Sequence, residues 1–160
     1  YNAWYGLGTV YYRQEKYVMS EYHFRYALNI NSKSSVLFCY AGMAKHALGE
    51  NSDAMTLLSQ AIALDEKNPL ARYEMAAVLM SEENYDQALE ELQTLQEIAP
   101  KEASVFFLMG RIYKKLGLQE KAMINFSIAL DLRPSNADVN SIKSAIEKLD
   151  SDEVSDEEDI

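Results

Sequence analysis

The sequence predicts an all-α fold, a solenoid of antiparallel helix pairs, and three observations lead to this prediction. One pattern of large, small and turn-forming residues recurs four times at a spacing of 34 residues, without insertion or deletion. The eighth position of every copy holds a small residue, namely Gly8, Gly42, Ala76 and Gly110. Prolines that interrupt helices lie near the junctions between copies, at Pro69, Pro100 and Pro134. Apolar faces should therefore be buried between neighbouring repeats, without a single central core.

Four repeats are predicted, spanning residues 1–34, 35–68, 69–102 and 103–136. Each should contain a first helix of about fourteen residues, a short turn and a second helix. The small residue at position eight lets these two helices approach closely. Gly49 and Gly117 follow the first helix of their repeats, where glycine can take the left-handed conformation that ends a helix. Because Leu95 stands where the other repeats have alanine, the junction of the third repeat should pack differently.

The end of the chain predicts a capping helix and an acidic tail. A helix is expected over 137–149, where Val139, Ile142, Ile146 and Leu149 form one apolar stripe that can cover the last repeat. Residues 150–160 carry seven acidic side chains and no basic one, so we expect this tail to be disordered. Ser155 precedes three acidic residues and is a candidate phosphorylation site. The alternative is a solvated tail without a special role.

Composition excludes several classes of protein. The net charge is −10, but outside the tail it is only −3 and no basic stripe is present, which argues against nucleic acid. No apolar run reaches the length of a membrane span, so no membrane association is expected. The single cysteine, Cys39, favours a reducing compartment, and we expect the nucleus and the cytoplasm. Tyr1 already occupies the first position of a repeat, so a further repeat is expected upstream.

The sequence contains no convincing catalytic or metal-binding constellation. Cys39 and His46 share a helix face, but at seven residues' separation they are about 10 Å apart. That distance is too long for a thiol and its general base. His23 has no cysteine or second histidine at metal-ligand spacing. We therefore expect no enzyme, no cofactor and no metal.

The repeat pattern resembles the tetratricopeptide repeat, whose copies stack into a superhelix. In that family the first helices line the concave side through positions two, five, nine and twelve. The resemblance, with one nearby carboxylate, gives these groove candidates: Asn2, Tyr5, Tyr12, Cys39, Met43, His46, Tyr73, Glu74, Phe107, Arg111 and Lys114.

This predicted groove is aromatic and rich in sulfur. The chaperone-binding relatives of the fold hold a peptide carboxylate with Lys and Asn at positions five and nine, and these residues are missing there. Glu74 is the nearest carboxylate for a guanidinium group. Arg111, Lys114 and Lys115 could accept an acidic segment or a terminal carboxylate, although a solvated helix end is an equally good reading.

Several stretches resemble the carboxy-terminal repeats of the cell division cycle protein 27 family, the third subunit of the anaphase-promoting complex. They are residues 1–8, 67–70, 100–102, 110–117 and 125–132. The resemblance is specific because Asn2, Asn68 and Lys101 are not expected to be required by repeat packing. It implies a non-catalytic arm of a ubiquitin ligase that acts in cell-cycle control.

The same resemblance implies particular partners. They are other subunits of the complex and coactivators whose tails end in Ile-Arg, and the full-length protein would dimerise through amino-terminal repeats that are absent here. Two alternatives remain open at this stage. One is a generic tetratricopeptide adaptor or co-chaperone, and the other is an enzyme, or its regulatory lid, whose catalytic domain lies elsewhere.

Overall fold

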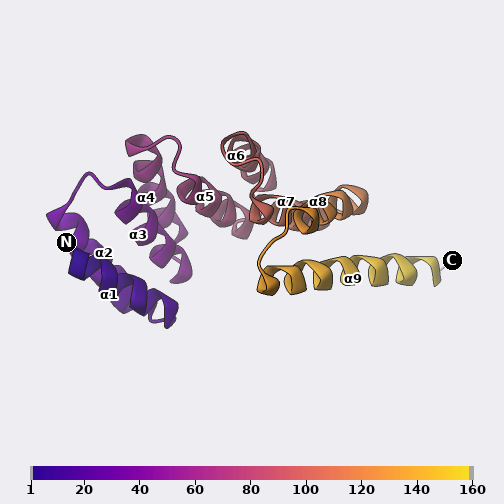
Figure 1. The fold of residues 1–160 in the computed structure, drawn as a ribbon, viewed down its shortest axis with the longest axis horizontal. Coiled ribbons are helices and arrows are strands. Elements are labelled where there is room, and N and C mark those ends of the chain that lie inside the picture. Colours follow the sequence, from indigo (N-terminus) through magenta and orange to yellow (C-terminus); the bar gives the residue numbers. More distant parts are fainter. Residues whose placement is uncertain (1, 159–160) are drawn as a thin grey trace. The chain divides into compact units, whose positions relative to one another are not determined.

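The computed structural model describes the backbone of residues 2–158 and the side chains of residues 2–151. Over this part of the chain it contains nine α-helices and no strand (Figure 1), which confirms the predicted all-α class. The helices form two compact units, Tyr1–Asn84 and Tyr85–Ile160, and each is described by itself. None of the described helices is both long enough and apolar enough to cross a bilayer.

The first unit contains five helices: α1 (Asn2–Arg13), α2 (Tyr17–Ile30), α3 (Ser35–Ala47), α4 (Asn51–Leu64) and α5 (Pro69–Ser81). Helices α1 and α2 pack as one pair and α3 and α4 as the next, while α3 also contacts α1, α2 and α5. A core cluster joins the first pair to α3 and consists of Phe24, Ala27, Leu37, Ala41 and Ala44. The first helices of successive repeats are therefore direct neighbours in this unit.

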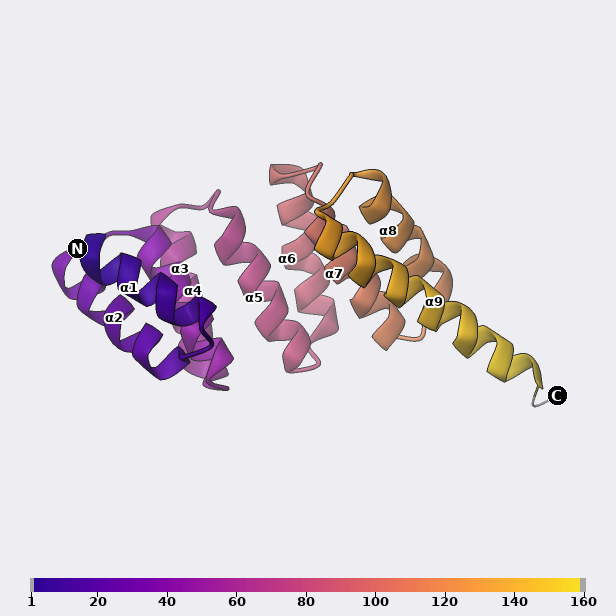
Figure 2. The same ribbon diagram turned by 60° about the horizontal axis from the view of Figure 1, so that its bottom comes forward.

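The second unit contains α6 (Tyr85–Ile98), α7 (Ala103–Lys115), α8 (Gln119–Asp131) and α9 (Asn136–Glu158). Helices α7 and α8 form a pair, and α9 runs alongside α8 (Figure 2). Ile142 and Leu149 of α9 are each only 1% exposed and join Phe106, Phe126 and their neighbours in one core cluster. This packing covers the apolar face of the α7–α8 pair, as expected for a capping helix.

The boundary between the units falls inside the span predicted as the third repeat. Helix α5 belongs to the first unit and α6 to the second. The grouping of residues 69–102 into one packed helix pair therefore stays a prediction. Leu95, the large residue expected to alter this repeat, is buried in α6.

Position eight of the repeats marks the closest approach of paired helices. A Cβ atom on Gly8 would lie 2.7 Å from Cε1 of Phe24, and one on Gly42 would lie 2.9 Å from Cγ of Leu58. The corresponding distance from Gly110 to Cε1 of Phe126 is 2.5 Å. These distances are too short for any side chain, so the predicted close contact is confirmed at all three glycines.

The first helix of every repeat ends in the same turn. Its residue at position fifteen has a left-handed backbone, with φ of 59° at Glu15, 79° at Gly49, 61° at Glu83 and 76° at Gly117. The next amide donates to the carbonyl five residues earlier, as Glu50 N does to Lys45 O at 2.9 Å. This is the 6→1 hydrogen bond of a Schellman motif. The left-handed conformation was predicted at the glycines of two repeats. In the other two repeats, a glutamate has the same conformation.

Asn68 has a packing role that the sequence did not reveal. Its Oδ1 accepts from Ala71 N at 3.1 Å and so caps α5. Its Nδ2 donates to Ser35 Oγ at 2.8 Å, and that hydroxyl donates to Ala61 O, also at 2.8 Å. Because Asn68 is buried and ties α3, α4 and α5 together, the expectation that repeat packing does not require it is wrong.

The last helix is longer than predicted. The apolar stripe predicts a helix that ends at Leu149 and the acidic composition predicts no structure over 150–160, whereas α9 continues to Glu158. Residues 150–158 contain no proline or glycine to interrupt the helix, and glutamate is a good helix former. Asp159 and Ile160 lie outside the described residues.

Candidate functional site

The first unit brings four of the predicted groove residues together. Tyr12 lies on α1, Cys39 and His46 on α3, and Glu74 on α5. They interact electrostatically, since Glu74 raises the pKa of both Tyr12 and Cys39 while His46 acts on Glu74. Residues far apart in the sequence therefore meet on adjacent first helices. We call Tyr12, Cys39, His46 and Glu74 the α1–α3–α5 cluster.

Glu74 is the chemically unusual member of this cluster. Its side chain is half-buried, and this partial burial raises the pKa of its carboxyl above the ordinary value of 4.5. His46 acts in the opposite direction and lowers the pKa. Among the residues that the structure describes, no lysine or arginine forms an ion pair with Glu74. Among the described residues, the charge of Glu74 is therefore offset by His46 and by no lysine or arginine.

Burial also raises the pKa of two neighbouring side chains, Cys39 and Tyr12. Cys39 is fully buried, and burial followed by the charge of Glu74 raises the pKa of its thiol to about 12. Burial, then Glu74, raises the pKa of Tyr12 to about 12. Both groups are neutral at pH 7. Cys39 is thus neither a thiolate nucleophile nor a thiolate metal ligand in this state.

His46 is held in place by a short polar chain. Its Nδ1 lies 3.0 Å from Asn51 Oδ1, and Asn51 Nδ2 donates to Ser81 Oγ at 3.3 Å. Since an amide oxygen can only accept, Nδ1 carries a proton and donates it to Asn51 Oδ1. Asn51 and Ser81 fix the imidazole, and no motif in the sequence distinguishes them as supporting residues.

Tyr5 belongs to an aromatic cluster beside this site. Its ring centroid is 5.6 Å from that of Tyr40 and 6.3 Å from that of Phe24. Burial, then a hydrogen bond with Tyr5, raises the pKa of Tyr40. Asn2 is exposed at the start of α1, and Met43 and Tyr73 are half-buried on α3 and α5. Tyr5 therefore contributes to packing as well as to the predicted surface.

Three predicted groove residues lie on α7 in the second unit. The ring of Phe107 is 5.6 Å from that of Phe126, and the guanidinium carbon of Arg111 is 6.0 Å from the Phe107 ring centroid. Arg111 and Lys115 are exposed, while Lys114 is half-buried. Because the candidates divide between two units, their union in one groove stays a prediction. The side chain of Ser155 lies outside the described residues.

No group of three or more His, Cys, Asp or Glu side chains within the described residues could hold a metal ion. The α1–α3–α5 cluster offers a half-buried carboxylate, Glu74, that could pair with a cation, together with the half-buried ring of Tyr12.

Comparison with known proteins defines the class. Family models described as tetratricopeptide repeat match residues 45–112 and 103–136. The solved structure of YrrB, titled a TPR protein with an unusual peptide-binding site, is 28% identical with a TM-score of 0.71, covering 89% of this chain and 73% of that one. PilF of Pseudomonas aeruginosa is 20% identical with a TM-score of 0.83, covering 96% of this chain and 69% of that one. The fold is therefore a tetratricopeptide-repeat helical solenoid.

Curated relatives narrow the assignment. Cell division cycle protein 27 homolog B of Arabidopsis thaliana is 50% identical over 93% of this chain and 20% of its own length. Anaphase-promoting complex subunit 3 of Schizosaccharomyces pombe is 40% identical over 94% of this chain and 22% of its own length. The chain belongs to this family, known as cell division cycle protein 27 or anaphase-promoting complex subunit 3. It spans about a fifth of the length of these two relatives.

Proposed function

We propose that the chain is a protein-interaction scaffold segment of an anaphase-promoting complex, without catalytic activity of its own. Its family membership and its repeat fold support the scaffold role. The observation that carries a binding role is the half-buried carboxylate of Glu74, which His46 influences but which has no lysine or arginine partner among the described residues. A buried charge is costly unless it is paired, so this position suits a cation supplied by a binding partner.

The partner that fits this chemistry is a coactivator tail ending in Ile-Arg. Its guanidinium group would pair with Glu74 in a charge-assisted, bidentate hydrogen bond. Its isoleucine would pack on the neighbouring surface of Tyr12 and Met43, which are half-buried. We extend the proposal to a location in the nucleus and the cytoplasm and to dimerisation of the full-length protein through upstream repeats.

The pKa of Glu74 gives this binding a pH dependence. Burial raises that pKa, so more of the carboxyl is protonated near pH 5 than for an exposed glutamate. A guanidinium group pairs only with the ionised form. Affinity should therefore fall as the pH is lowered toward the raised pKa, and rise to a plateau above it.

Calorimetric titration of the chain with an eight-residue peptide ending in Ile-Arg tests this site. Glu74→Gln should weaken binding at least tenfold, which corresponds to about 1.4 kcal/mol. Glu82→Gln, at the exposed end of the same helix, is the matched control and should leave the affinity unchanged. An amidated peptide shows whether the terminal carboxylate contributes. Failure of the peptide to bind, or equal affinities for both variants, would reject Glu74 as the receptor for the tail.

A further inference from the structure

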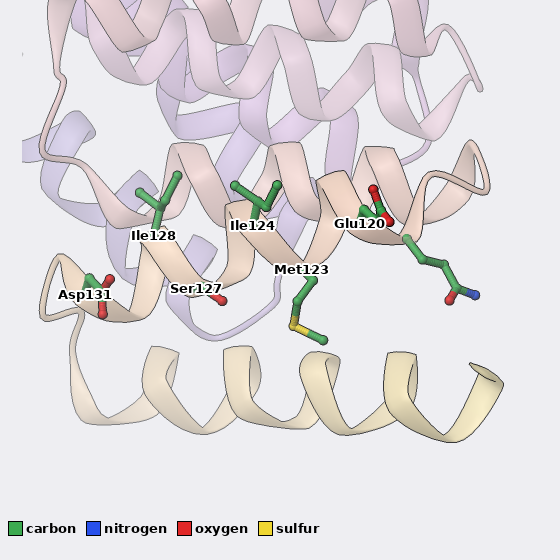
Figure 3. Close-up of a pocket in the computed structure, with 7 residues that line it drawn as sticks. Glu120, Met123, Ile124, Ser127, Ile128 and Asp131 are labelled. Carbon is green, nitrogen blue, oxygen red and sulfur yellow. The ribbon is translucent and has the colours of Figure 1, made fainter. Parts of the chain in front are cut away.

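The outer surface of α8 carries a groove that the proposed function does not use (Figure 3). Its volume is about 500 Å³, within the range of ligand-binding clefts. It is lined by Gln119, Glu120, Met123, Ile124, Ser127, Ile128 and Asp131. All seven residues belong to α8, so the groove is a feature of the second unit alone.

The groove has three aliphatic lining residues: Met123 and Ile128 are half-buried against the core cluster, and Ile124 is exposed. Ala122, Phe126 and Ala129 turn the opposite side of α8 into the hydrophobic cluster with α7 and α9. Ile124, in the middle of the groove, remains 58% exposed. Figure 3 shows Ile124 and Ile128 side by side along one edge, with Met123 on the other. Ile124 and Ile128 are four residues apart and so lie on one side of the helix, whereas Met123 points to the other side, toward α9.

The two ends of the groove are acidic. Glu120 and Asp131 are both exposed and lie eleven residues apart, which is about 16 Å along a helix. The described residues that line the groove include no cation, and the nearby Lys121 lies over the ring of Tyr113, with Nζ 5.6 Å from its centroid. The surroundings are acidic as well, since Tyr85–Ile160 has 16 acidic and 8 basic residues and so carries −8 of the chain's net charge of −10.

We propose that this groove docks an amphipathic helix of a partner protein. The partner helix would carry an aliphatic stripe, which covers Met123, Ile124 and Ile128, and a basic residue at each end of that stripe. Helix-in-groove recognition uses apolar anchors at this spacing, and opposite charges at the ends fix the register. The groove has no cation to hold a terminal carboxylate, so its occupant is an internal segment. The occupant of the α8 groove therefore differs from the Ile-Arg tail proposed for Glu74, and the two proposals are independent.

A designed peptide probes the site directly. It is an 18-residue, end-capped, alanine-based helix with leucines at spacings of three and four, and two arginines eleven residues apart. Isoleucine δ1-methyl NMR of the whole chain should show shifts of Ile124 and Ile128 on titration. Ile30 and Ile62 of the first unit should not shift.

Matched variants test the aliphatic contact. Ile124→Ser should weaken peptide binding at least fivefold. Ile30→Ser removes an equally exposed isoleucine, 59% against 58%, and should leave the affinity unchanged. Circular dichroism of each variant should match that of the parent chain, because neither side chain is part of the core.

Charge variants test the ends of the groove. The double variant Glu120→Gln, Asp131→Asn should weaken binding at least threefold and reduce its dependence on salt. A peptide with glutamates in place of both arginines should not bind. Shifts at other isoleucines, equal binding of the acidic peptide, or the same loss from Ile30→Ser would overturn the proposal. So would shifts of Ile124 that depend on protein concentration without peptide, since they would make a second copy of the chain the occupant.

Discussion

The side chain at position eight of each repeat sets how closely two helices can pack. Gly6 and Gly8 lie on the same helix but have opposite surroundings. A Cβ atom on Gly8 would clash with the buried ring of Phe24, whereas one on Gly6 would meet nothing within 4 Å. Gly8 therefore serves packing, while Gly6 only lowers the stability of the helix.

Alanine at these two positions should have opposite effects on stability. Overpacking costs about 1–3 kcal/mol, and replacing a helical glycine by alanine gains about 1 kcal/mol. Gly8→Ala should therefore lower the free energy of unfolding, and Gly6→Ala should raise it by up to about 1 kcal/mol. Urea unfolding followed by circular dichroism measures both. Equal effects of the two substitutions would contradict the close packing of α1 on α2.

The reactivity of the Cys39 thiol shows whether the candidate site is closed to solvent. Burial and Glu74 raise the pKa of its thiol from 9.0 to about 12, which lowers the thiolate fraction at pH 8 by about a thousandfold. Iodoacetamide should therefore modify the native chain at least a hundredfold more slowly than the urea-unfolded chain, as monitored by mass spectrometry. Equal rates would show that the cluster is open to solvent.

The same shift has a consequence for stability at alkaline pH. The folded thiol keeps its proton to a higher pH than the unfolded thiol, so unfolding releases a proton above about pH 9. Stability contributed by this group is complete below that pH and declines as the pH rises toward 12. Cys39→Ala should make the decline shallower, and Tyr12, whose pKa is also raised, should account for part of the remainder.

At the scale of the helices, the turn after each first helix follows one geometry with two kinds of residue. Gly49 and Gly117 take the left-handed conformation without strain, whereas Glu15 and Glu83 have a Cβ atom that opposes it. Glycine at Gly49 and Gly117 revealed this turn in the sequence. At the other two positions the amino acid itself gave no such signal, and only the 34-residue register pointed to it.

This difference predicts a stabilising substitution. Glu83→Gly should raise the free energy of unfolding by about 1 kcal/mol, because it removes the cost of a left-handed residue that is not glycine. The matched control is Glu82→Gly one residue earlier, where φ is −89° and glycine relieves nothing. Thermal melting compares the two variants. A melting temperature raised equally by both, or by neither, would contradict the turn geometry.

The helix boundaries show where sequence reasoning succeeded and where it could not. The repeat spacing predicted a first and a second helix in every repeat, because each position has the same packing role in every copy. The packing role of Asn68 was not predicted, because Ser35, to which it donates, and Ala61, to which Ser35 donates, become its neighbours only after the repeats stack. The end of α9 at Glu158 was not predicted, because the acidic composition of residues 150–160 indicates disorder while their helix propensity favours a helix.

At the scale of the whole molecule, the candidate site could be predicted only in part. The resemblance to tetratricopeptide repeats named Tyr12, Cys39, His46 and Glu74, and the packing of α1, α3 and α5 brings them together. The amino-acid sequence could not show that Glu74 is half-buried without a lysine or arginine partner among the described residues, because its surroundings come from three repeats. The α8 groove was also missed, since the aliphatic residues of a helix do not reveal which of them remain exposed.

The proposed role of this chain is that of an interaction segment of the anaphase-promoting complex. Its most direct test is a chimera in Schizosaccharomyces pombe, where the chain replaces the homologous segment of anaphase-promoting complex subunit 3, to which it is 40% identical over 150 residues. If the chain has this role, the chimera should support cell division and co-purify with the other subunits. A control chimera with an unrelated four-repeat array of equal length should do neither. A stably expressed chimera that neither assembles nor supports division would contradict the proposed role as an interaction segment.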